Sequence, residues 1–118
     1  MSSYIQKRQY YRLRYPKRAR PFVRLGDELF QVAEVSEGGI RMVVANSNTM
    51  YKGLEIKGML NLNDESRVEI EGAVWRFERD EVIVQLREGP TFKIMVEEQR
   101  KIRSNYPVFF ARLREAAA

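Results

Sequence analysis

Residues 67–77 read Arg67-Val-Glu-Ile-Glu71 followed by Gly72-Ala-Val-Trp-Arg-Phe77, and they carry the clearest strand signal in the chain. In the first five of them, charged and apolar side chains alternate. A period of two puts one kind of side chain on each face of an extended chain, which is typical of a strand with one face buried and one in water. The sequence therefore predicts a half-exposed sheet around this strand.

Shorter apolar runs lie on both sides of this strand and are separated by residues that favour turns. Gly26-Asp-Glu28 joins two of the runs, and Asn63-Asp-Glu-Ser66 and Glu78-Arg-Asp80 bound the strand itself. The predicted strands are residues 22–25, 29–35, 40–44, 55–62, 67–77 and 81–86. Short strands at this spacing predict a mainly β fold, a closed or nearly closed antiparallel barrel.

The pattern changes to a helical one after Gly89-Pro90. Thr91 is a suitable N-cap, and the apolar spacing that follows defines one buried helix face. That face comprises Phe92, Met95, Val96, Gln99 and Ile102. Pro107 predicts a helix end near Asn105–Tyr106, with a second short helix over residues 108–115. The acidic pair Glu97-Glu98 is interpreted as solvated surface.

Composition narrows the classes of function. The chain has 118 residues, 44% of them hydrophobic and 31% charged, with neither cysteine nor histidine. Disulfides, thiolate metal sites and cysteine nucleophiles are therefore excluded, and catalysis becomes a poor expectation without the commonest general base. No metal site or acid–base pair stands out. With no apolar run near the ~20 residues of a membrane span and no signal-peptide pattern, we expect a cytoplasmic protein without membrane insertion.

Positive charge is concentrated at the N-terminal end. The first 26 residues contain eight lysines and arginines and no acidic residue, whereas the net charge of the whole chain is only +5. Pro16 and Pro21 disfavour a helix through the second half of this segment. We therefore divide the chain into a basic, largely irregular arm (residues 1–20) and a barrel with its helical end (residues 21–118). The charge asymmetry points to an anionic partner.

Two short motifs carry the candidate chemistry. Arg12, Arg14, Arg18 and Arg20 lie in the arm, and a guanidinium both matches phosphate oxygens and stacks on aromatic bases. In Glu34-Val-Ser-Glu-Gly-Gly39, a carboxylate and a hydroxyl two residues apart lie on one strand face and suit a guanine edge. Each motif by itself has a plainer interpretation. The arm could be a solvated basic tail or a non-specific nucleic-acid anchor, and the glycines could simply form a turn.

Taken together and in this order, the motifs resemble those of the PilZ domain family. Arg14 and Arg18 fit the RxxxR motif of that family, and Ser36 and Gly39 fit its (D/N)xSxxG motif. Gly72-Ala-Val-Trp-Arg76 is similar to a later PilZ strand, and Glu97-Glu-Gln-Arg100 with Tyr106-Pro107 is similar to the C-terminal helix of one subgroup. The resemblance implies a six-stranded antiparallel PilZ-like β-barrel with a C-terminal α-helix.

The resemblance also implies a function. A PilZ domain is not an enzyme and has no cofactor; it binds the bacterial second messenger cyclic di-GMP and signals to a downstream protein, whose identity stays open here. DNA is not an expected partner. The residues implied to bind the ligand are Arg12, Arg14, Arg18, Glu34, Ser36, Gly39 and Trp75. For Trp75, the only tryptophan, packing in the core is the plainer interpretation and stacking on the ligand is the other.

One departure from the family pattern keeps a second hypothesis open. Glu34 stands where the family has Asp or Asn, and its extra methylene moves the carboxylate outward. A misplaced hydrogen bond of this kind costs roughly 1–3 kcal/mol. The rival hypothesis is therefore a degenerate PilZ-like adaptor that acts through protein contacts without binding cyclic di-GMP. A basic RNA-binding barrel ranks last, because the aromatic residues lie mostly in the arm or at core-like positions.

Overall fold

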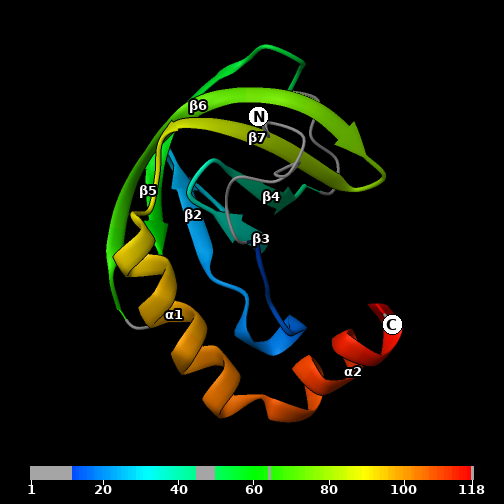
Figure 1. Cartoon of the computed structure of the whole chain (residues 1–118). Coiled ribbons are helices and arrows are strands. Elements are labelled where there is room, and N and C mark those ends of the chain that lie inside the picture. Colours follow the sequence, from blue (N-terminus) through cyan, green and yellow to red (C-terminus); the bar gives the residue numbers. More distant parts are fainter. Residues whose placement is uncertain (1–11, 45–49, 64, 118) are drawn as a thin grey trace, which may run out of the picture.

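The computed structural model describes residues 12–44, 50–63 and 65–117, the side chains of residues 116 and 117 excepted. Six strands form a closed antiparallel barrel, and a seventh, β1, lies outside it (Figure 1). The elements are β1 (Leu13–Arg14), the 3-10 helix η2 (Lys17–Ala19), β2 (Phe22–Leu25), β3 (Glu28–Ser36), β4 (Gly39–Val43), β5 (Glu55–Asn61), β6 (Arg67–Glu78), β7 (Glu81–Glu88), α1 (Phe92–Asn105) and α2 (Pro107–Ala117).

The barrel closes because β2 pairs with one edge of β3 and β4 pairs with the other edge. The sheet runs β3-β2-β5-β6-β7-β4, and β4 then pairs with β3 again. The bulge between Val32 and Glu34 lies on β3 where it pairs with β4. Such a bulge bends a strand and increases its twist, which helps a sheet of this size to curl onto itself.

The core fills the inside of the barrel with the residues that the period-two pattern selects. Along β6, Val68, Ile70 and Val74 are buried, and the charged residues between them face outward. All six predicted strands are confirmed, with ends that differ by at most two residues. The predicted fold class is confirmed, with one outer strand and a second C-terminal helix in addition.

The described part of the predicted arm is more ordered than the sequence suggested. Leu13 and Arg14 form β1 on the edge of β3, next to β2, and residues 17–19 form η2. Leu13, Tyr15 and Ala19 are all buried in the main core cluster. The basic side chains hide this pattern in the sequence, because they alternate with the apolar residues that hold the segment. Residues 1–11 lie outside the described residues.

The helical end confirms the predicted boundaries and corrects two side-chain assignments. The Thr91 hydroxyl caps α1 by accepting from the amide of Ile94, and α1 ends at Asn105 before Pro107 opens α2. Phe92 is exposed instead of buried, since Ile94 and Met95 are the residues of the first turn of α1 that pack on the core. The interpretation of Glu98 as solvated surface is wrong, since this residue is fully buried.

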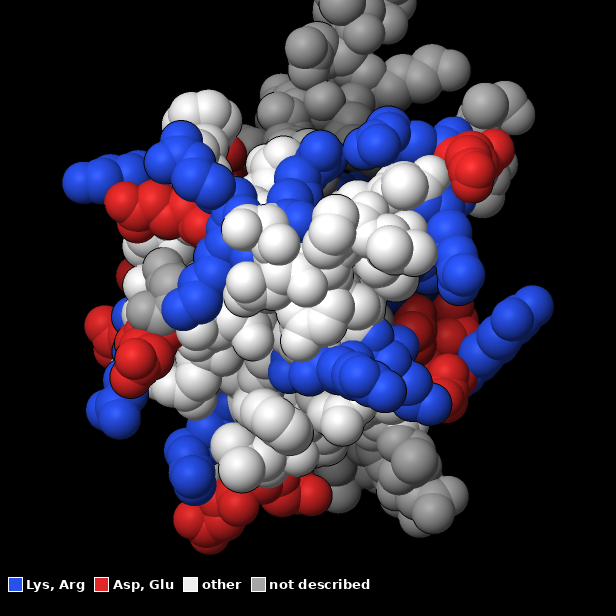
Figure 2. All heavy atoms as spheres, turned by 90° about the horizontal axis from the view of Figure 1, so that it is seen from below, with Lys and Arg blue, Asp and Glu red and all other residues white. Residues whose placement is uncertain are grey.

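The two helices lie at one end of the barrel, at the bottom of Figure 1. Figure 2 looks onto that end and shows an uncharged centre bordered mainly by lysine and arginine side chains. Neither helix in the described part of the chain is long and apolar enough to cross a bilayer.

Candidate functional site

Strand register brings part of the two sequence motifs onto one row of the outer barrel face. In the antiparallel ladders Arg14 of β1 lies opposite Glu34 of β3, and Glu34 lies opposite Arg41 of β4. The row continues through Ile83 of β7 to Arg76 of β6. Directly opposed residues share a face with their Cβ atoms about 5 Å apart. We call Arg14, Glu34, Arg41, Ile83 and Arg76 the arginine row.

A second row runs beside the first, two positions further along β3, β4 and β7 and three along β6, where the bulge adds a residue, and hence about 7 Å away. It comprises Ser36, Gly39, Gln85 and Ala73, again as successive ladder partners. Together with the arginine row it makes up the outer-face site. Three arginines and one carboxylate therefore lie beside a row of small or neutral polar residues, which suits a ligand with anionic groups and a flat polar body.

The β3–β4 turn fixes the end of the second row. The Ser36 hydroxyl is largely buried and accepts from the amide of Gly38 at 3.3 Å, and it lies 3.3 Å from the carbonyl of Gly39. A Cβ added at Gly39 would lie only 3.0 Å from the carbonyl oxygen of Val84. The serine thus holds the turn, and glycine is needed where the strands approach closely.

A surface pocket of about 410 Å³ opens beside this turn. Two members of the second row, Ala73 and Gln85, form part of its lining. The small side chain of Ala73 leaves room over the strands, and Gln85 offers both a donor and acceptors. The remaining lining residues are Glu37, Gly38, Leu86 and Arg87.

Trp75 lies outside the core, and its interpretation as core filling is wrong. The register shifts between Val74 and Arg76, so Trp75 is the extra residue of a bulge on β6. Its side chain is 43% exposed, and the guanidinium of Arg76 lies 4.5 Å from its ring centroid. A bulge re-aims side chains in this way. An exposed indole beside an arginine is available for stacking on a base.

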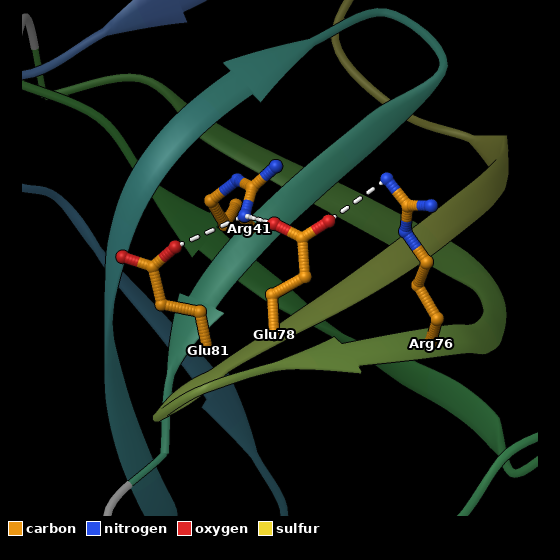
Figure 3. A network of polar contacts seen from close by, with 4 residues as sticks. All are labelled: Arg41, Arg76, Glu78 and Glu81. Atoms are coloured by element: carbon orange, nitrogen blue, oxygen red, sulfur yellow. Dashed lines mark hydrogen bonds and ion pairs between the residues drawn. The ribbon is translucent and has the colours of Figure 1, made fainter.

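Two carboxylates hold Arg41 within the arginine row (Figure 3). Its Nη1 donates to Glu78 Oε1 at 2.8 Å and to Glu81 Oε1 at 3.1 Å. Glu78 also bridges to Arg76 through a contact of 2.9 Å. The hydrogen bond from Arg41 lowers the pKa of Glu78, and the same bond raises the pKa of Arg41. Arg41 is therefore partly neutralised, whereas Arg14 is exposed.

This network predicts a pH-dependent contribution to stability. The folded-state pKa of Glu78 lies below its ordinary value of 4.5, so the pair stabilises the fold above that pH and the effect is lost as pH falls through the folded-state pKa. We expect Glu78→Gln to lower the urea midpoint near neutral pH, with a difference from wild type that shrinks between about pH 6 and pH 3. Glu28→Gln, at an exposed β3 position, is the control. A pH-independent difference would contradict the pairing.

The structure thus brings together Arg14, Glu34, Ser36 and Gly39 from the predicted set. Arg12 is exposed directly before β1, and Arg18 is exposed on η2 outside the ladders. Sequence reasoning missed Arg41, Arg76 and Gln85. The signal for Arg41 was present, because it is the charged residue between the apolar Ile40 and Met42 of a short strand and must face outward.

Among the described residues, no group of three or more acidic side chains is placed to hold a metal ion.

Comparisons with known proteins agree with this architecture. The family described as the PilZ domain matches residues 6–103. An inhibitor of motility from Bacillus subtilis, MotI/DgrA, superposes with a TM-score of 0.63 at 20% identity, over 86% of this chain and 53% of that one. The chain therefore spans about half the length of that relative. No curated protein sequence matches the chain.

A second solved structure is the PilZ domain of YcgR from Escherichia coli, in complex with c-di-GMP. It superposes with a TM-score of 0.55 at 16% identity, over 95% of this chain and 98% of that domain. At these identities the superpositions show the fold. Because the family match covers most of the chain, this protein belongs to the PilZ domain family.

Proposed function

We propose that this protein is a receptor for cyclic di-GMP that binds the nucleotide over the outer-face site and acts by binding, without catalysis. The observation that carries the proposal is the ladder pairing of Arg14 with Glu34, beside the row of Ser36 and Gly39. This pairing puts Arg14 of the first motif on one surface with the second motif, although the sequence separates them. The YcgR domain of the same fold was solved with c-di-GMP, which supports this choice of ligand.

Each motif has a distinct role in the proposed complex. Arg14 and Arg18 contact the phosphates and stack on the guanine bases, as a planar guanidinium permits. Glu34 accepts from a guanine edge, Ser36 and Gly39 hold the turn on which the nucleotide rests, and Trp75 offers a stacking face at the other end of the arginine row. Arg12 is within reach as a further phosphate contact. Binding then changes the surface that is offered to a downstream protein.

The packing of residues 13–19 on the barrel determines which groups can move when the nucleotide binds. Because Leu13 and Tyr15 are already buried, the backbone of residues 13–19 has little ordering left to complete on binding. We therefore place the response in the arginine side chains, with the exposed Arg18 closing over the ligand. This lowers the entropic cost of binding compared with a wholly loose arm.

The adaptor hypothesis remains the second candidate because of the surroundings of Glu34. This residue has an arginine on either side of it in the ladder, Arg14 and Arg41. The attraction of Glu34 contributes to the raised pKa of Arg41. A carboxylate that is attracted by positive charge on either side is less available to guanine, so the same geometry also fits a domain that has lost its ligand.

Substitutions of Glu34 separate the two hypotheses. For a receptor, we expect Glu34→Asp to hold or improve affinity, since it restores the family residue and removes one rotatable bond. Glu34→Ala should weaken binding by roughly 1–3 kcal/mol, because guanine donors lose their acceptor. For an adaptor, the wild type shows no binding and Glu34→Asp creates it. Calorimetric titration of the three proteins measures this, and tight binding indifferent to both substitutions would remove Glu34 from the site.

Trp75 fluorescence tests the choice of ligand. The single tryptophan lies next to Arg76 of the outer-face site and is 43% exposed, so a nucleotide stacked on it should quench its emission saturably. We expect cyclic di-GMP to do so at lower concentration than GMP or a short RNA, at both low and moderate salt. The titration with RNA is included because Trp75 and Phe77 are exposed, which removes the sequence argument that ranked RNA binding last. Tighter, strongly salt-dependent RNA binding would contradict the proposal.

A further inference from the structure

A buried carboxylate joins helix α1 to the arginine motif. Glu98 is fully buried, and its Oε2 accepts a 2.8 Å hydrogen bond from the hydroxyl of Tyr15. Tyr15 is itself only 3% exposed and follows Arg14 directly in the sequence. The bond joins residues 83 positions apart, one near the start of the described chain and the other in α1.

Asn63, in the turn between β5 and β6, ties a second point of the same segment to this carboxylate. Its backbone amide and its Nδ2 donate to Glu98 Oε2 at 3.2 and 3.1 Å. The same Nδ2 lies 2.7 Å from the carbonyl oxygen of Ala19, to which it donates. Glu98 therefore holds Tyr15 directly and Ala19 through Asn63. Tyr15 directly follows Arg14 in the sequence, and Ala19 directly follows Arg18.

The chemistry of this node differs from that of a stabilising ion pair. Removing a carboxylate from water is costly unless hydrogen bonds compensate it. Three donors converge on Oε2, whereas the buried Oε1 has no hydrogen-bond partner among the described residues. An apolar residue at position 98 would fill the helix interface without this cost, so a role that needs the acceptor explains the residue better.

We propose that Glu98 is a positioning residue for the nucleotide site. It fixes the segment between Tyr15 and Ala19, so that Arg14 points along the outer face beside Glu34 and Arg18 is presented from η2. Helix α1 thereby becomes part of the framework of the arginine motif, although the two are far apart in the sequence. This inference rests on the proposed binding of cyclic di-GMP.

Conservative variants isolate the node from general packing. Tyr15→Phe removes one hydroxyl and keeps the buried ring, while Glu98→Ala removes the acceptor for all three donors. Glu98→Gln keeps one acceptor oxygen, removes the charge and puts an NH2 donor in place of the second oxygen. Ile102→Val is the matched control, because Ile102 is 1% exposed on the same helix and makes no bond to the motif. Each variant is first checked for the wild-type circular dichroism spectrum, and Tyr15→Phe decides the matter if Glu98→Ala does not fold.

Two measurements are made on each variant: calorimetric affinity for cyclic di-GMP, and hydrogen exchange at the amides of Tyr15 and Ala19. These amides bond to the carbonyls of Ala33 and Pro16 and report whether the segment is held. We expect Tyr15→Phe to weaken binding about threefold to tenfold, with a larger loss in Glu98→Ala and faster exchange at both amides. Ile102→Val should stay within about twofold of wild type, whereas Glu98→Gln, which keeps one acceptor oxygen, should lose less affinity than Glu98→Ala.

Separate outcomes overturn the inference and the proposed function. Unchanged exchange and affinity in Tyr15→Phe and Glu98→Ala, with normal wild-type binding, would overturn the positioning role alone. An equal loss of affinity in Ile102→Val would also overturn it, because the effect would then follow helix stability. No saturable binding by the wild type would overturn the proposed function, and with it the role of Glu98 toward the nucleotide.

Discussion

Replacing Arg14 or Arg18 with alanine is expected to weaken cyclic di-GMP binding at least about tenfold, since a lost charge-assisted phosphate contact costs roughly 1.5–3 kcal/mol. Arg14 lies on the outer face opposite Glu34, and Arg18 lies exposed on η2. Neither side chain contributes to the barrel core, so the loss should appear in affinity and leave the thermal midpoint nearly unchanged. Calorimetry together with a thermal melt of each variant measures both quantities.

Arg24→Ala is the matched control for these two variants. Arg24 is an exposed arginine of the same basic segment, but it lies on β2 and pairs with Leu29 and Met59 away from the outer-face site. Removing it takes away the same charge, so a general electrostatic effect would weaken all three variants alike. Full affinity in both the Arg14 and the Arg18 variants would refute their assignment and direct attention to Arg12 and Arg20.

Leu13→Ala is expected to destabilise the protein by about 2–5 kcal/mol, the usual cost of truncating a buried leucine. Leu13 is fully buried and lies opposite Val35 in the ladder between β1 and β3. Such a cost is large compared with the 5–15 kcal/mol of a typical domain, so the urea midpoint should fall clearly. The result would establish that the beginning of the arginine motif belongs to the fold.

The neighbouring Arg12→Ala serves as the comparison, because Arg12 is exposed and directly precedes β1. Surface changes of this kind usually stay within about 0.5 kcal/mol. If Leu13→Ala were as mild as Arg12→Ala, residues 12–20 would form the loose arm that the charge pattern suggests, and their packing on the barrel would be refuted.

The barrel could be predicted from the sequence because its strands obey a local rule. Alternation along Arg67–Glu71 and the turn residues around the strand depend on neighbours in the chain, and these signals locate strands reliably. β1 could not be predicted in this way, because its pairing depends on a segment that is distant in the sequence. It has two residues, and only its partner β3, 20 positions away at Arg14 and Glu34, makes it a strand.

The candidate site could be predicted only in part. Ser36 and Gly39 are recognisable because a turn requires them locally, and the arginines because they repeat at a fixed spacing. Trp75 and Glu98 were misjudged since their burial depends on tertiary structure. A bulge on β6 turns Trp75 outward, and three donors from distant segments make a buried carboxylate acceptable at position 98.

The register of the barrel also gives a physical meaning to the motif spacing. Glu34 and Ser36 are two positions apart on β3, and Gly39 and Arg41 are two positions apart on β4. Because the strands are antiparallel and joined by a tight turn, these four residues form two adjacent pairs on one face. An insertion of one residue between Glu34 and Ser36 would turn the side chains of one of these pairs toward the barrel interior, and the outer-face site would be lost.

The most direct test of the central claim is one calorimetric titration of the wild-type protein with cyclic di-GMP. We expect saturable binding that a matched titration with GMP does not reproduce. GMP offers the arginine row one phosphate and one guanine, whereas cyclic di-GMP offers it two of each. Heat no different from ligand dilution, in a protein shown to be folded, would contradict the receptor assignment and favour the adaptor.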